Sequence, residues 1–291
     1  MKKSILFTAL AALLVATSCA GSTEQTGNQK PKAPEREGWY GGPLYGDVES
    51  VTITKYDVVD KFGEIVKDKI TSKTLYRFNQ KGDVIEEAYY NSDGSLKDKL
   101  LYKYDSQGNK IEGARYNSDG SLDKKSLYKY DSQGNMIEEA SYNSDGSLDD
   151  KSLYKYDSQG NLIELAWYNS VGWLDWKSLY KYDSQGNKIE GVHHNSSGSL
   201  YWKEIYKYDS QGNMIEVAYY NSDGSLDDKS LYKYDYQGNQ IEEAWYNSDG
   251  SLKDKWLTKY DSKGNLVERI SYKGEIMKPT AMKVQEIVYR K

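Results

Sequence analysis

The sequence predicts an all-β fold, an elongated antiparallel β-meander of about eight 26-residue β-hairpin repeats with a twisted or curling sheet and terminal capping strands. Three observations predict it. One string recurs every 26 residues, each copy contains two turn signals, and the segments between the turns alternate in character, are rich in Tyr, Leu and Ile, and lack proline. The units begin at Leu75, Leu101, Leu127, Leu153, Leu179, Ile205, Leu231 and Leu257.

The turn signals set the strand boundaries and the register. They are Asp-Ser-Gln-Gly, as at 131–134, and Asn-Ser-Asp-Gly, and both carry Asp or Asn first and Gly fourth. That order is typical of a type I turn followed by a left-handed glycine, the three-residue hairpin loop with a bulge. We expect Tyr130 to face Met136 and Tyr128 to face Glu138, with a mainly aromatic face turned toward the interior of the sheet.

Two charged positions recur through the array. The position of Glu138 holds Glu in all eight units, and the position of Lys151 holds Lys in seven. A row of carboxylates suits catalysis or cation binding, but a residue present in every unit usually serves what every unit needs, which is stacking. We therefore interpret the Glu row as structural: each Glu accepts a hydrogen bond from a facing Tyr or pairs with a Lys across strands.

The first residues have the anatomy of a signal peptide. Two early lysines precede an apolar run at 5–16, and small residues lead to Cys19, the only cysteine of the sequence. This segment resembles the lipobox of bacterial lipoproteins, which implies that Cys19 is lipidated and anchors the chain in the bacterial cell envelope. By the same resemblance, Ala20 and Gly21 favour the outer membrane. The alternative is a plain secreted protein with an unpaired cysteine.

The remaining segments differ in composition from the repeats. The stretch after Cys19 is polar, contains two prolines and cannot build a core, so we expect a flexible linker. The segments on either side of the repeats are strand-like, and we expect them to cover the sheet edges. The expected organisation is a signal peptide at 1–18, a lipidated Cys and linker at 19–38, an N-terminal capping β-hairpin at 39–72, the repeats at 73–273 and a C-terminal capping strand at 274–291.

The string YKYDSQGN, with Tyr102, Tyr104, Asp105, Gly108 and Asn109 and their equivalents, resembles the YD repeat of the RHS family. It is similar, more loosely, to MORN-like hairpin repeats. The YD resemblance implies β-hairpins that wind into large shells. Here the period is 26 residues, Asn follows the Gly, and eight units look too few to close a shell. Because no toxin domain or self-cleaving segment follows the repeats, the resemblance implies a hairpin array on the cell envelope and not a toxin.

The units that depart from the consensus are where we expect a ligand. Around residues 167–202, Asn-Ser-Val-Gly-Trp replaces Asn-Ser-Asp-Gly-Ser, and two tryptophans replace Asp or Lys. In the register given above, one aromatic patch on the Tyr face is formed by Tyr168, Trp176, His194, Trp202 and Tyr220. A flat aromatic surface with a polar rim suits sugar rings or a protein partner. The alternative is that these tryptophans fill a tighter curve of the sheet or are drift between duplicated units.

Several classes of function are disfavoured. The net charge is -5, and Lys and Glu are interspersed without a basic stripe, which argues against nucleic-acid binding. His193 and His194 are adjacent and point to opposite faces of a strand, so a zinc site is not expected. The string at 117–123 lacks the first acidic ligand and the closing Glu of a calcium loop. We expect no metal, no cofactor and no catalytic residue.

The sequence as a whole favours a lipid-anchored protein of the cell envelope that acts as a non-catalytic binding module. The expected partners are the membrane, through the N-terminal lipid, and a polysaccharide or an envelope protein. One alternative is a passive structural spacer or surface-coat element, in which no patch binds anything specifically. A second alternative is a glycan-active enzyme that uses a pair of Glu side chains.

Overall fold

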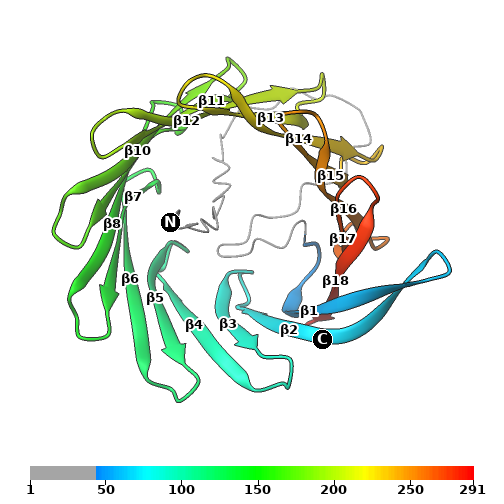
Figure 1. Ribbon diagram of the computed structural model, residues 1–291. Helices are drawn as coiled ribbons and strands as arrows, with labels where there is room; N and C mark the ends of the chain where they lie inside the picture. The colour runs from blue at the N-terminus through cyan, green and yellow to red at the C-terminus, as the bar shows by residue number, and fades with distance from the viewer. Residues whose placement is uncertain (1–43) are drawn as a thin grey trace, which may run out of the picture.

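The computed structural model describes residues 44–291, which form one antiparallel sheet of eighteen strands connected in chain order (Figure 1). The strands are β1 Val48–Lys61, β2 Glu64–Phe78, β3 Val84–Tyr90, β4 Leu96–Tyr104, β5 Lys110–Asn117, β6 Leu122–Tyr130, β7 Met136–Asn143, β8 Leu148–Tyr156, β9 Leu162–Asn169, β10 Leu174–Tyr182, β11 Lys188–Asn195, β12 Leu200–Tyr208, β13 Met214–Asn221, β14 Leu226–Tyr234, β15 Gln240–Asn247, β16 Leu252–Tyr260, β17 Leu266–Lys273 and β18 Lys278–Tyr289. The predicted all-β meander of hairpin repeats is confirmed.

The sheet closes into a barrel because its first and last strands pair with each other. β18 lies antiparallel to β1, and β1 also pairs with β2. Arg290 strengthens this closure: its guanidinium donates to the backbone carbonyls of Phe78 and Asn79 and pairs with the carboxylate of Asp47. The expectation that eight units are too few to close was wrong, because the strands at both ends of the chain join the array and cover each other's edges.

The hairpin turns have the predicted geometry. In the turn after β6, the backbone N–H of Gly134 donates to the carbonyl of Asp131, and that of Asp131 donates to the carbonyl of Asn135, at 3.2 and 2.9 Å. Gly134 has a φ of 87°, in the left-handed region that glycine adopts without strain. The Asp131 carboxylate also accepts from the Asn135 backbone N–H at 2.9 Å, which explains why Asp opens this turn in unit after unit.

A further β-bulge directly beyond each turn changes the register. The pair nearest the turn is as expected, but the bulge places an extra residue, Ile137, in β7. As a result Tyr128 faces Glu139 rather than Glu138. An equivalent bulge at Asp149 in β8, beyond the next turn, pairs Leu153 with Glu138. The expected pairing was therefore wrong by one residue. Bulges of this kind increase the local twist, which helps a sheet to curl into a barrel.

The two faces of the sheet become the inner and outer walls of the barrel. The chain enters β1 from inside the ring (Figure 1), and Leu44 packs there against Val51, Phe78 and Val84. Alternation along the strands from these residues assigns the tyrosine rows of the array, including Tyr76, to the inner wall. The aromatic face is thus turned inward, as expected.

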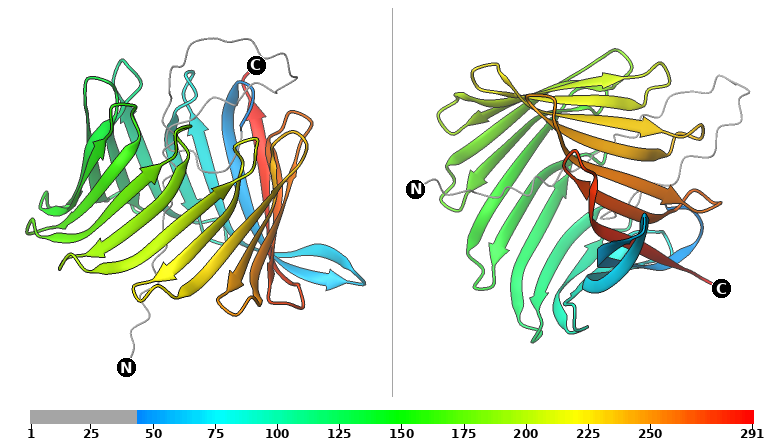
Figure 2. Two further views of the ribbon diagram at one scale, coloured as in Figure 1. Left: turned by 90° about the horizontal axis from the view of Figure 1, so that it is seen from above. Right: turned by 45° about the vertical axis from the view of Figure 1, so that its right-hand side comes forward.

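One hairpin projects beyond the wall. β1 pairs with β18 only as far as Tyr56, and β2 pairs with β3 only from Lys73, so residues between them form a two-stranded hairpin that extends from the barrel (Figure 2). At its tip, Phe62 is fully exposed and has a φ of 59°, a conformation that bulky side chains rarely adopt. The turn is completed by Gly63, whose backbone N–H donates to the Asp60 carboxylate at 2.7 Å.

The structural description begins after the predicted targeting region. The signal peptide at 1–18, Cys19, the linker at 19–38 and the first residues of the N-terminal capping segment lie outside the described residues. Within 44–291, there is no helix with the length and apolar character needed to cross a membrane.

Candidate functional site

The outer wall is nearly the same in every unit. Glu138 lies between two lysines, with its carboxylate oxygens 2.8 Å from Lys129 Nζ and 3.2 Å from Lys151 Nζ. The hydrogen bond from Lys129 holds the pKa of Glu138 below its usual value. The same double pairing occurs at Glu112, Glu164, Glu190 and Glu242. The expected pairing of the Glu row with Lys across strands is confirmed at these positions.

The inner wall, in contrast, differs from unit to unit. The position of Glu139 holds Glu, Gly, Leu, Val or Arg across the array, and the position of Ser141 holds Tyr, Arg, Ser, Trp or His. The position of Asp150 holds Asp, Lys or Trp. All three positions share the face of the inner tyrosines in the observed register. The residues that distinguish one unit from another are therefore directed into the lumen.

Two inner tyrosine rows are nearly constant, each broken once, by Thr258 and by Phe78, and one of them has a clear structural task. The hydroxyl of Tyr156, at the end of β8, donates to the backbone carbonyl of Met136, at the start of β7, at 2.8 Å. Regular pairing of β7 with β8 ends at Leu153, so this bond closes the pair where the ladder stops. We call it the tyrosine clasp. Equivalent clasps are donated by Tyr104, Tyr130, Tyr182, Tyr208, Tyr234 and Tyr260.

Aromatic side chains line the inner wall from β9 to β16. We name this set the aromatic arc: Trp167, Trp176, His193, Trp202, Tyr219, Trp245 and Trp256. The rings of His193 and Trp202 are stacked with centroids 3.6 Å apart. Tyr219 continues the run, 6.1 Å from Trp202 and 5.9 Å from Trp245, and Trp256 follows at 6.2 Å from Trp245. Trp167 and Trp176 form a separate stacked pair at 6.3 Å.

The five residues predicted from the sequence do not share one face. Trp176 and Trp202 lie on the inner wall, whereas Tyr168, His194 and Tyr220 lie on the outer wall. Trp176 faces Trp167 and Asn195, and Trp202 faces His193 and Asn221. The predicted contiguous patch was therefore wrong, because the bulges move each partner by one residue and so to the other face.

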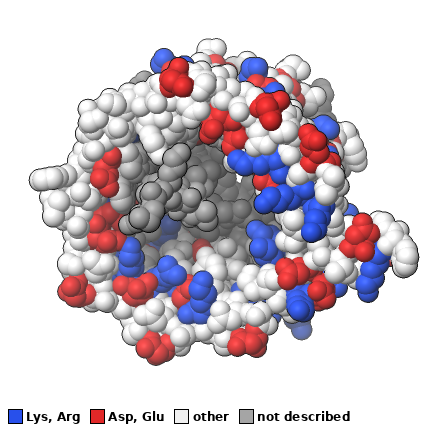
Figure 3. Space-filling model, viewed as in Figure 1, with Lys and Arg blue, Asp and Glu red and all other residues white. Residues whose placement is uncertain are grey.

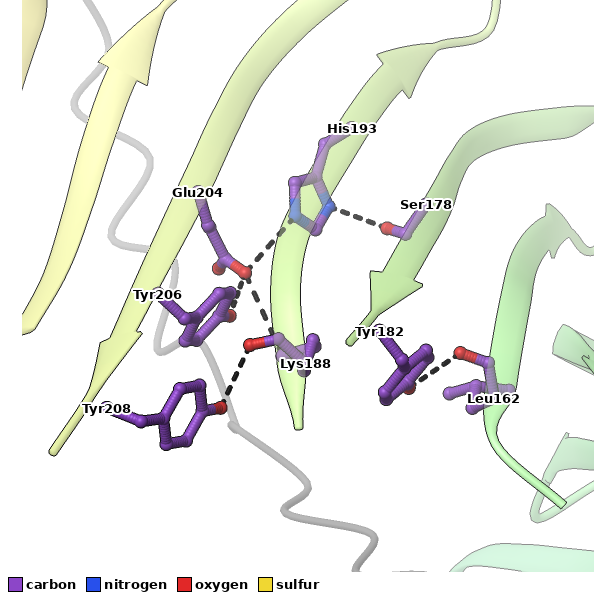
Figure 4. A network of polar contacts seen from close by, with 8 residues as sticks. All are labelled: Leu162, Ser178, Tyr182, Lys188, His193, Glu204, Tyr206 and Tyr208. Carbon is purple, nitrogen blue, oxygen red and sulfur yellow. Dashed lines mark hydrogen bonds and ion pairs between the residues drawn. The ribbon is translucent and has the colours of Figure 1, made fainter. Parts of the chain in front are cut away.

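A buried polar network lies beneath the arc (Figure 4). Ser178 Oγ and His193 Nδ1 are 2.6 Å apart, and His193 Nε2 lies 3.8 Å from Glu204 Oε2. Tyr206 donates its hydroxyl to Glu204, and Lys188 Nζ lies 3.9 Å from the same carboxylate. Sequence reasoning missed this set, since its members are spread over three strands that only the observed register brings together.

The network is better suited to holding the arc than to chemistry on a substrate. Burial alone raises the pKa of Glu204, but the adjacent His193 and the Tyr206 hydroxyl outweigh it and hold this pKa below its usual value. Burial lowers the pKa of Lys188, which lies between the rings of Tyr180 and Tyr206. Ser178 has an exposed fraction of 0%, so its hydroxyl cannot reach a bound molecule.

The described part of the chain offers no arrangement of three or more His, Cys, Asp or Glu side chains that suits a metal ion. Charged side chains are nevertheless visible inside the barrel. Figure 3 shows Lys and Arg side chains gathered on one side of the inner wall, on the side where Figure 1 places β16, β17 and β18. The lumen thus presents both aromatic and basic surfaces.

Neither a protein-family model nor a curated protein sequence matches the chain. Solved structures with similarity include the Tc holotoxin pore of Photorhabdus luminescens, at 12% identity and a TM-score of 0.36 over 79% of this chain and 13% of that one. A porin-like protein from Bacteroides uniformis has 9% identity and a TM-score of 0.46, over 83% of this chain and 98% of that one. The chain spans 16% of its counterpart in a TcdB2-TccC3-Cdc42 complex, at 13% identity and a TM-score of 0.34. Similarity at this level concerns the β-rich architecture alone.

Proposed function

We propose that this protein is a lipid-anchored, non-catalytic binding protein of the bacterial cell envelope that holds a polysaccharide chain in the lumen of its barrel. One observation carries the proposal. The outer wall repeats the same residues, whereas the inner wall varies and gathers the aromatic arc. A position that serves only stacking has no reason to vary from unit to unit, so variation concentrated on one face is typical of a recognition surface.

The chemistry of the arc favours a sugar chain over a protein partner. Successive aromatic rings at spacings of 5.9–6.2 Å from Trp202 to Trp256 offer a series of flat apolar surfaces. Carboxylates beside the rings could accept hydrogen bonds from the hydroxyl groups of a sugar. Glu243 accepts a hydrogen bond from Trp245 Nε1 at 2.8 Å, and Asp228 lies on the same face as Tyr219. A flexible, narrow polymer fits inside a barrel, whereas a folded partner would meet the constant outer wall.

The outer wall supports a barrel that stands in water and not among lipid chains. Every complete repeat places Lys and Glu side chains on this wall, and a Lys at the middle of a lipid layer costs about 2–4 kcal/mol. Attachment to a membrane then falls to the N-terminal lipid on Cys19, which the lipobox resemblance supports. Replacing Cys19 with Ala and following incorporation of labelled fatty acid tests the anchor: loss of the label is expected, and retained label would contradict it.

Binding is tested with the full chain on an array of bacterial and plant polysaccharides, followed by fluorescence of the tryptophans. We expect a bound chain to protect tryptophan fluorescence from quenching by acrylamide, because the arc supplies five of the seven tryptophans. A bound polysaccharide that leaves quenching unchanged would place its site elsewhere. No binding to any glycan would favour the passive spacer.

A further inference from the structure

Three basic side chains face one another across neighbouring strands of the inner wall. Lys55 of β1 lies directly opposite Lys283 of β18, and Lys283 lies directly opposite Arg269 of β17. Alternation from Val51, which packs inside the barrel, places Lys55 and its facing partner Lys283 on the inner wall. Arg269 reaches the inner Trp256, so it lies on the same wall. We call these three residues the basic triplet.

The triplet is only partly neutralised. Arg269 forms an ion pair with Glu243 at 2.6 Å. Neither Lys55 nor Lys283 has a carboxylate within ion-pair distance among residues 44–291, and both are exposed to the lumen. Partial burial of Lys283 against the curved wall, and then the charges of Arg269 and Lys55, lower the pKa of Lys283.

Such an arrangement costs stability in the free protein. Side chains directly opposite each other in an antiparallel pair have Cβ atoms about 4.5–5.5 Å apart, and like charges at that spacing repel. The outer wall avoids this by placing Glu between its lysines, as at Glu138. On the inner wall the repulsion within the basic triplet remains, and a bound anionic group would relieve it.

The triplet also continues the aromatic arc. The guanidinium carbon of Arg269 lies 5.4 Å from the ring centroid of Trp256, the last ring of the arc. Lys283 and Lys55 follow on the next two strands round the ring. One path along the inner wall therefore runs from the rings of the arc, through Arg269, to two lysines that form no ion pair within residues 44–291.

We propose that the polymer held in the lumen is an acidic glycan, with sugar rings on the aromatic arc and a carboxylate or sulfate group bound by Lys55, Lys283 and Arg269. The proposal rests on the proposed function and adds the charge class of the ligand. A free inorganic anion could also bind the three basic side chains, but it would make no contact with the aromatic arc. These two sources give different results in the experiment below.

The experiment compares oligogalacturonate with the same oligosaccharide after reduction of its carboxyl groups, each titrated calorimetrically into the full chain at low salt. The variants are Lys55→Gln/Lys283→Gln in the triplet and Lys151→Gln/Lys177→Gln on the outer wall. We expect the wild type to bind the acidic form at least about tenfold more tightly, since one charged hydrogen bond is worth about that factor. The triplet variant loses this preference, and the outer-wall variant keeps it.

Each result has a definite meaning. Equal affinity of the wild type for the two oligosaccharides would overturn the proposal that the ligand is acidic. It would leave the proposed glycan-binding lumen intact. Absence of binding by either oligosaccharide and by the array glycans would overturn both. Inorganic sulfate could instead abolish the preference for the acidic oligosaccharide and itself bind as tightly as that oligosaccharide. This result would assign the triplet to a free anion and contradict the proposal. Unfolding temperatures guard against misfolding: the triplet variant should melt at or above the wild type, since it removes a repulsion.

Discussion

The tyrosine clasp gives the clearest prediction about stability. Tyr130, Tyr182 and Tyr234 each donate a hydrogen bond to a backbone carbonyl, with lengths of 2.8, 2.8 and 2.7 Å. Replacing a tyrosine with phenylalanine removes the hydroxyl and leaves the ring, so the change isolates the hydrogen bond. A hydrogen bond contributes about 0.5–1.5 kcal/mol net to the free energy of unfolding. Clasps in alternate units share no partner, so their effects should add.

We therefore expect Tyr130→Phe to lower the free energy of unfolding in urea by about 0.5–1.5 kcal/mol, and the triple variant with Tyr182→Phe and Tyr234→Phe by about 1.5–4.5 kcal/mol. The matched control makes the same three changes on the outer wall, at Tyr142, Tyr168 and Tyr220. These hydroxyls donate no hydrogen bond within residues 44–291 and should change stability by less than about 0.5 kcal/mol. A triple clasp variant as stable as its control would refute the proposed role of the clasps.

Three further predictions concern the hairpin tip, the closure and the buried carboxylates. Phe62→Asn should raise the melting temperature, because Asn adopts the observed positive φ at a free-energy cost about 1 kcal/mol lower than Phe does. An unchanged or lower melting temperature would contradict backbone strain at Phe62. Arg290→Ala should weaken the β1–β18 junction, detected as faster hydrogen exchange in β1 and β18 than in β8; uniform exchange would argue against it. Burial raises the pKa of Glu87 above 4.5, because it outweighs the hydrogen bonds from the hydroxyls of Tyr89 and Tyr102. Glu87→Gln should therefore be more stable than the wild type at neutral pH, and the difference should be lost as the pH falls through the raised pKa. Glu204, whose pKa is lowered, has the opposite sign: Glu204→Gln should be less stable above about pH 4.5, and the wild type should lose its advantage as pH falls further. Urea unfolding at several pH values checks both signs.

The sequence was sufficient to predict the hairpins because their determinants are local. Asp131 and Gly134 specify the turn through contacts within five residues, and the repetition of those contacts predicts the meander. The pairing of Glu138 with lysines on the neighbouring strands also needed only the comparison of units, since both charged positions recur in nearly all of them.

The site was harder to predict because a single bulge changes the face of every later residue in the strand. Tyr168, His194 and Tyr220 were placed inside, and they lie outside. The bulged residue, here Ile137, is an apolar residue like its neighbours in the strand, so the sequence does not distinguish it from a regularly paired residue. Closure depends on pairing between β1 and β18, which are more than 200 residues apart and lie outside the repeat. The periodic pattern therefore does not predict it.

The faces of the wall allow a direct test of the binding lumen. The inner variant Trp176→Ala/Trp202→Ala/Trp245→Ala and the outer variant Tyr168→Ala/His194→Ala/Tyr220→Ala remove three aromatic rings each, on opposite sides of the same stretch of sheet. Both are titrated with the glycan that the wild type binds most tightly, after urea unfolding has shown that each is folded. A glycan-binding lumen predicts that the inner variant loses affinity at least tenfold while the outer variant binds as the wild type does. Loss of binding in the outer variant, with the inner variant unaffected, would contradict it.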